Sequence, residues 1–156
     1  MNIQLLNRTD PERILVNVLN GEASSLTTGY GVCLAVGNED VVASANGVTA
    51  VMFTTSAELN PAFIGVAKGD IAPNAYGPVI SWGFADSIAL SQEANVTVGL
   101  LAGASLLIAG AQAGTFTSAA AGWETISTFA GKYVVNATTQ STNGAINFTR
   151  GFVRCM

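Results

Sequence analysis

The chain contains no histidine and only two cysteines, Cys33 and Cys155. Without histidine, every site that needs an imidazole is excluded, including Ser-His-Asp and Cys-His nucleophilic centres and zinc sites with histidine ligands. The neighbours of Cys33 in the sequence, Val32 and Leu34, are apolar and disfavour a reactive thiolate. Two isolated cysteines are no disulfide framework, so we expect two free thiols.

The chain also contains few charged residues. Charged residues make up 10% of the chain and hydrophobic residues 49%, so much of the surface must be neutral. The net charge is −4 and no basic run is present, which argues against nucleic acid as a partner. Two acidic clusters, Asp10 with Glu12 and Glu39 with Asp40, lack the ligand pattern of a calcium loop. We predict a protein that is not an enzyme and that holds no cofactor and no metal.

Long apolar runs are absent as well. Residues 94–123 carry no charge, but their continuous apolar part, residues 98–110, is interrupted by glycine and is shorter than the roughly 20 residues that a bilayer requires. The N-terminus has no basic leader followed by an apolar run, so it does not read as a secretory signal. The sequence therefore predicts no membrane partner and synthesis in the cytoplasm.

What the chain does contain is the alternation typical of β-strands. Residues 13–20, RILVNVLN, alternate and end at the turn dipeptide Asn20-Gly21, and several short runs after them are separated by clusters of Gly, Ser, Thr and Asn. No window shows sustained helical periodicity. We predict an all-β fold, an antiparallel β-barrel or β-sandwich with little helix, in one domain over residues 13–156. Residues 1–12 are a candidate N-terminal arm.

Two tryptophans stand out. In GPVISWGF the side chains of Ile80, Trp82 and Phe84 alternate with small residues, so we expect all three on the buried face of a strand that pairs with residues 63–67. Trp123 lies among small residues, and its sequence context fits a position in the core and a position in an interface equally well.

The stretch FIGVAKGDIAPNAYGPVISWGF, the Gly/Ala-rich segment after it and the closing GFVRCM resemble the small all-β decoration (cement) proteins of tailed-bacteriophage heads. ERILVNVLNG and LTTGYGV are similar to the opening strands of related phage proteins, so the resemblance extends over most of the chain. It implies a hairpin within the first stretch and a β-barrel or β-tulip-like subunit. It also implies a homotrimer that binds the major capsid protein on the outer surface of the virion and stabilises the shell, after synthesis in the host cytoplasm.

Under this hypothesis, residues 1–12 are the candidate for a capsid-contacting arm, with an ordinary frayed chain end as an equal alternative. The candidate interface residues are Asn2, Ile3, Leu5, Leu6, Arg8 and Trp123. The alternative functions are another structural role in the virion, such as head completion, or a tail- or fibre-associated β-module that binds a receptor or carbohydrate. A carboxylate-based enzyme ranks last, because the acidic residues show no convergent pair.

Overall fold

The computed structural model describes residues 13–35, 49–52, 63–91, 105–107, 113–118, 129–133 and 146–155. These residues form nine strands and no helix, which confirms the predicted all-β fold. The strands are β1 (Arg13–Asn20), β2 (Gly31–Leu34), β3 (Thr49–Met52), β4 (Phe63–Ala67), β5 (Tyr76–Leu90), β6 (Ser105–Leu107), β7 (Thr117–Ser118), β8 (Phe129–Tyr133) and β9 (Asn147–Arg154). The candidate arm, residues 1–12, lies outside the described residues.

The first five strands hydrogen-bond in a closed ring, in the order β1-β3-β2-β4-β5 and back to β1. All pairs in the ring are antiparallel except β1 with β3, which is parallel at Leu19–Thr49 and Asn20–Ala50. The β1–β3 contact therefore departs from the predicted antiparallel pairing. The reason is geometric, because strand direction cannot alternate all the way around a ring with an odd number of members.

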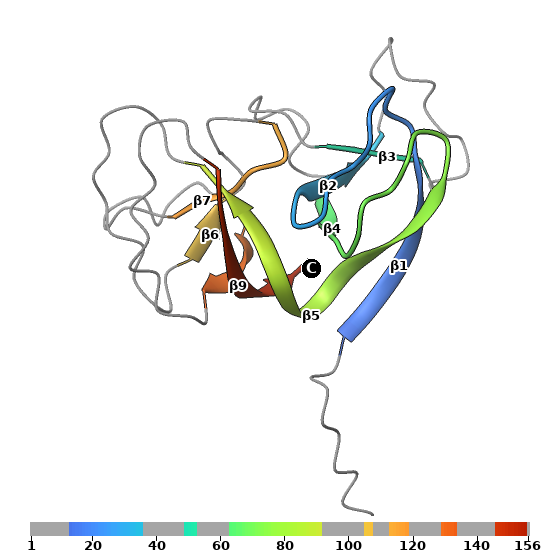
Figure 1. The fold of residues 1–156 in the computed structure, drawn as a ribbon. Helices are drawn as coiled ribbons and strands as arrows, with labels where there is room; N and C mark the ends of the chain where they lie inside the picture. The colour runs from blue at the N-terminus through green and yellow to red at the C-terminus, as the bar shows by residue number, and fades with distance from the viewer. Residues whose placement is uncertain are drawn as a thin grey trace, which may run out of the picture.

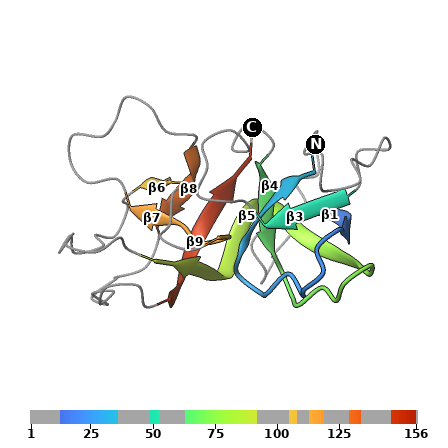
Figure 2. The ribbon, with the colours of Figure 1, turned by 90° about the horizontal axis from the view of Figure 1, so that it is seen from above.

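The long strand β5 joins this ring to the rest of the sheet. Its first half pairs with β1 and β4, and its second half pairs with β9, which continues through β8 and β6 to β7. The view from above places β5 between strands β1–β4 on one side and strands β6–β9 on the other (Figure 2). The register of β5 shifts twice, against β1 and again against β9, and its ribbon bends strongly between the two groups of strands (Figure 1). Such bulges increase local twist and bend a strand, which allows one strand to serve both groups.

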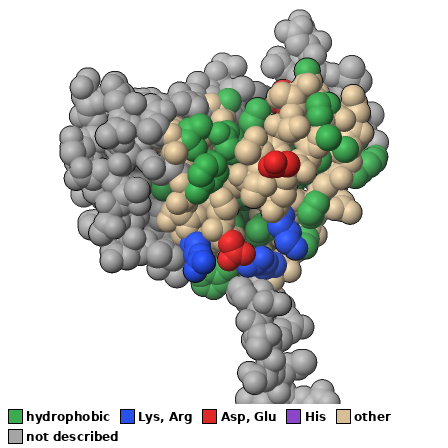
Figure 3. All heavy atoms as spheres, viewed as in Figure 1, with side chains coloured by type: hydrophobic (Ala, Val, Ile, Leu, Met, Phe, Trp, Pro, Cys, Tyr) green, Lys and Arg blue, Asp and Glu red, His purple; other side chains and the backbone are tan. Residues whose placement is uncertain are grey.

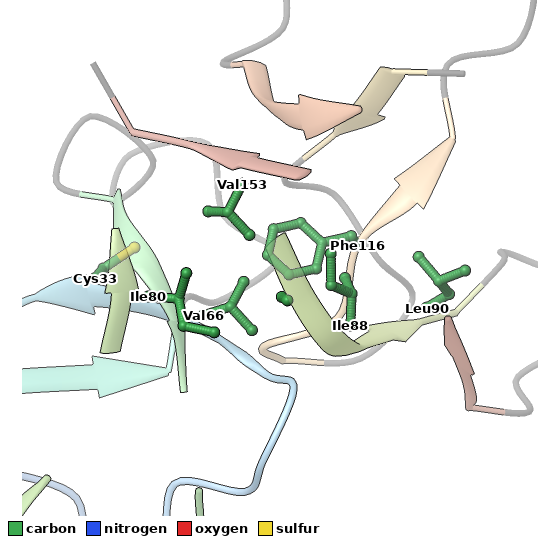
Figure 4. Close-up of a cluster of buried hydrophobic side chains, with 8 residues drawn as sticks. Cys33, Val66, Ile80, Ile88, Leu90, Phe116 and Val153 are labelled. Atoms are coloured by element: carbon green, nitrogen blue, oxygen red, sulfur yellow. The ribbon is translucent and has the colours of Figure 1, made fainter. Parts of the chain in front are cut away.

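Two hydrophobic clusters lie on opposite sides of the shared strands. Neighbouring residues of β2, Val32 and Cys33, belong to different clusters, and so do Val79 and Ile80 of β5. These strands are thus buried on both faces, which explains their continuous apolar runs. The first cluster contains Cys33, Val66, Ile80, Ala85, Ile88, Leu90, Phe116 and Val153 (Figure 4). The second contains Val18, Leu26, Val32, Ala50, Ala67, Ile71 and Val79.

The close approach of β4 and β5 depends on Gly65. This residue has a φ of +149°, and a Cβ placed on it would lie 2.2 Å from the carbonyl oxygen of Ile80 and 2.8 Å from Cγ1 of Val79. No side chain fits there without moving backbone. The pairing of β4 with β5 confirms the predicted pairing of these segments.

The sequence predicts that Ile80, Trp82 and Phe84 are all buried on one face of the strand. This prediction is wrong for Trp82 and Phe84. Ile80 is buried at 3% exposure, whereas Trp82 and Phe84 are half-buried. Ile80 pairs with Leu15 and Trp82 pairs with Ile14, so one residue of β5, Ser81, is extra at this point. Because Ile14 and Leu15 are consecutive, they point to opposite faces, and their partners Trp82 and Ile80 do the same.

Candidate interaction surface

One face of β9 alternates aromatic and basic side chains. Phe148, Arg150, Phe152 and Arg154 occupy every second position, and all are exposed except Phe152, which is half-buried. The residues between them, including Gly151 and the fully packed Val153, point to the interior. β9 therefore presents a line of aromatic and guanidinium groups outward, because side chains two residues apart share one face of a strand.

Neighbouring strands extend this line into a surface. Trp82 of β5 pairs with Arg154 on one side and with Ile14 of β1 on the other, and Phe84 pairs with Phe152. Paired residues lie on the same face of a sheet. We call this surface the aromatic–arginine face, which comprises Ile14, Trp82, Phe84, Phe148, Arg150, Phe152 and Arg154.

The aromatic rings at its centre hold one another in place. The ring of Phe152 meets Trp82 edge to face at a centroid distance of 4.9 Å, and it meets Phe84 in the same manner at 5.3 Å. At the far end Phe148 lies 6.5 Å from Tyr30 and remains 55% exposed. Edge-to-face pairs contribute about 0.5–1.5 kcal/mol each beyond the area they bury. The centre of the face is therefore pre-formed.

The charges on the face are unbalanced. Arg13 of β1 forms an ion pair with Asp86 of β5, with Nη2 2.8 Å from Oδ2. Within the described part of the chain, Arg150 and Arg154 have no carboxylate partner. On the side of the molecule drawn in Figure 3, basic side chains lie on both sides of an acidic one. A protein with a net charge of −4 thus carries on this face two guanidinium groups that no described carboxylate neutralises.

The start of β1 is exposed on both faces. Ile14, Leu15 and Val16 are consecutive apolar residues with 55%, 44% and 41% of their surface accessible. This part of β1 hydrogen-bonds to β5 along one edge, and β3 reaches β1 only at Leu19 and Asn20. Among the described residues the other edge of β1 is therefore unpaired before Leu19. An exposed apolar edge of this kind is a template for another strand.

The described residues offer little for covalent chemistry. Burial raises the pKa of the Cys33 thiol to about 12 and has the same effect on Cys155, so both remain protonated at neutral pH. The described residues contain no group of three or more acidic, cysteine or histidine side chains that could hold a metal ion. The part of the chain that the structure describes also has no helix of the length and hydrophobicity needed to cross a membrane.

The interface residues predicted from the sequence, Asn2, Ile3, Leu5, Leu6, Arg8 and Trp123, all lie outside the described residues. The aromatic–arginine face was not predicted. Its signal is present in NFTRGFVR, where Phe and Arg recur at every second position, but the same alternation also fits a strand whose phenylalanines point inward. Gly151 and Val153 fill the interior side instead, and this choice depends on the packing against β5.

No family model matches the chain, and the search of curated proteins found no relative.

Proposed function

We propose that the chain is a structural protein of a tailed-bacteriophage head that binds the major capsid protein on the outside of the shell and stabilises it. The support for this partner is the sequence resemblance to capsid decoration proteins. The stretch that carries the resemblance contains β4 and β5, which pair antiparallel, and the resemblance implies a hairpin there. In this proposal the protein is made in the host cytoplasm and ends on the outer surface of the virion.

The observation that best supports a role in binding is the aromatic–arginine face. Large aromatic side chains and arginine are the residue types enriched in protein–protein contacts. Here they are pre-positioned, since Phe152 packs edge to face against both Trp82 and Phe84. A protein that reinforces a shell needs contact area of this kind and no reaction centre.

The exposed edge of β1 supports self-association. Ile14, Leu15 and Val16 offer apolar surface on both sides of the strand, and among the described residues no strand pairs with the free edge before Leu19. We propose that the working form is a homotrimer in which this edge pairs with a neighbouring subunit. A contact between two different surfaces avoids open-ended fibres only when the rotation between subunits closes a ring, here a ring of three. Three capsid contacts acting together then hold the ring more tightly than any one of them.

The direct test is co-sedimentation with undecorated, expanded capsids of the phage that encodes the chain. We expect saturable binding of the full chain, and absence of binding would refute the proposed function. Light scattering on the purified protein tests whether it is a trimer. A monomer mass at every concentration would contradict the proposed trimer.

Variants separate the two contact regions. The double variant Leu15→Glu, Val16→Lys should lower the mass to that of a monomer, because charges replace the apolar edge. Tyr76→Ser is the matched control, since Tyr76 is also exposed, at 66%, but lies on β5. Removal of residues 1–12 should leave the fold intact and weaken capsid binding, and full binding by that variant would remove the arm from the proposal.

A further inference from the structure

The arrangement of charges on the aromatic–arginine face specifies the chemistry of its partner. Arg150 and Arg154 are four residues apart on β9, so their Cα atoms are separated by about 13 Å along the strand. Phe152 lies midway between them on the same face. Both guanidinium groups lack a carboxylate partner among the described residues, and the one ion pair within those residues joins Arg13 to Asp86.

We propose that this face binds an extended segment of a partner protein in which two carboxylates, about 13 Å apart, flank an apolar side chain. The inference rests on the proposed function, in which the partner is the capsid protein. A linear row of groups along one strand matches an extended ligand, since the side chains on one side of such a ligand recur at the same spacing. Each guanidinium can then form two parallel hydrogen bonds with a carboxylate.

From Gly151 to Val153, β9 cannot accept this segment at an edge. Over these residues it pairs with β5 on one side and with β8 on the other, so its backbone groups are engaged within the sheet. Around Phe152 the ligand therefore binds across the outward face through its side chains. Ile14 and Trp82 extend the apolar area beside Arg154, which favours a ligand with apolar groups as well as charge.

A single-stranded nucleic acid is the other polymer that aromatic and basic side chains can bind. It fits less well for two reasons. The central rings pack against each other edge to face, whereas bases require open ring faces for stacking. The chain is also net acidic, and nucleic-acid affinity depends on many phosphate contacts rather than two.

The test uses the full chain and a fluorescent peptide of repeating Glu-Thr-Leu-Thr sequence, followed by fluorescence anisotropy. This repeat places carboxylates four residues apart with leucine midway. We expect it to bind more tightly than a peptide of the same composition with adjacent glutamates, and binding should weaken as salt screens the charges. Equal binding of both peptides, or tighter binding of oligothymidylate, would overturn the inference.

Substitutions assign the binding to this face. Arg150→Gln and Arg154→Gln should each weaken peptide binding about two- to fivefold, the loss expected for one exposed ion pair. Lys68→Gln is the control, because Lys68 is also exposed and basic but follows β4. The double variant Arg150→Glu, Arg154→Glu should bind a repeating Lys-Thr-Leu-Thr peptide instead. A misfolded protein cannot show this change of preference from the acidic to the basic peptide. If the variant unfolds at the same temperature as the wild type but does not bind the basic peptide, the assignment of binding to this face is wrong.

Capsid co-sedimentation of the same variants distinguishes the inference from the proposed function. If the wild type sediments with capsids and the Arg150→Gln, Arg154→Gln variant does so equally, the inference fails while the capsid function stands. If the wild type does not sediment but binds the acidic peptide through these arginines, the inference stands and the capsid function fails.

Discussion

The side chain of Asn20 connects three backbone segments and offers a sharp test of the fold. It is fully buried at the end of β1. Its Nδ2 donates hydrogen bonds to the carbonyl oxygens of Ser24 and Ile71, and its Oδ1 accepts one from the amide of Glu22, each at 2.8 Å. The Asn20 backbone is separately bonded to Ala75, so a substitution removes the side-chain bonds alone.

Asn20→Ala should lower the free energy of unfolding by about 2–4 kcal/mol. The three hydrogen bonds, of which the one to Ile71 is buried and the other two are partly buried, contribute roughly 0.5–1.5 kcal/mol each. The Ile71 carbonyl adds little further cost, because it still accepts a hydrogen bond from the Leu26 amide in the variant. Urea unfolding at 25 °C gives the value, and an unchanged m-value shows that the comparison is valid. Asn17→Ala is the matched control: Asn17 is exposed on the same strand, so its loss should stay within about 0.5 kcal/mol.

Asn20→Asp adds a pH signature. A carboxylate there faces two carbonyl oxygens where the amide donated, so burial and repulsion raise the pKa of the introduced group above that of the unfolded chain. The protonated form is then favoured in the fold, and stability is lost as pH rises through this pKa. The variant should be less stable than Asn20→Ala at pH 7 and recover toward pH 4. If Asn20→Ala costs under 0.5 kcal/mol, or Asn20→Asp shows no pH dependence, the hydrogen-bond account of this corner is wrong.

Further predictions follow from the same contacts. Gly65→Ala should abolish folding or lower the melting temperature sharply, because its Cβ would overlap the Ile80 carbonyl; a stable variant with native circular dichroism contradicts this. Cys33 and Cys155 have pKa values raised from 9.0 to about 12, so both should resist iodoacetamide at pH 8 in the folded protein, and the stability they provide should be present below pH 9 and fall as pH rises toward 12. The amide and then the hydroxyl of Thr28 lower the pKa of Asp70, so the stability from this group should be present above pH 3.8 and be lost as acid protonates it, a dependence that Asp70→Asn should remove in acid-unfolding curves. Trp82→Ala should cost less than the roughly 3–5 kcal/mol of a fully buried tryptophan, and a cost in that range would place Trp82 in the core.

Much of the strand content was predictable from local pattern. The alternation in RILVNVLN and its Asn-Gly stop correspond to β1, which begins at Arg13 and ends at Asn20. The apolar runs around Val66 and Val79 correspond to β4 and β5 and their pairing. These predictions succeeded because strand propensity and turn residues act over a few neighbouring positions.

The sequence alone determined that this chain is all-β in its described part, poor in charge, and without an imidazole for chemistry. It did not determine which face of a strand is inside. In β5 one extra residue, Ser81, reverses the alternation and turns Trp82 outward while Ile80 remains in the core. The parallel contact of β1 with β3 and the exposure of Arg150 and Arg154 likewise depend on which strands meet. Alternation fixes only that successive side chains point to opposite sides, and the tertiary pairing decides which of the two sides is buried.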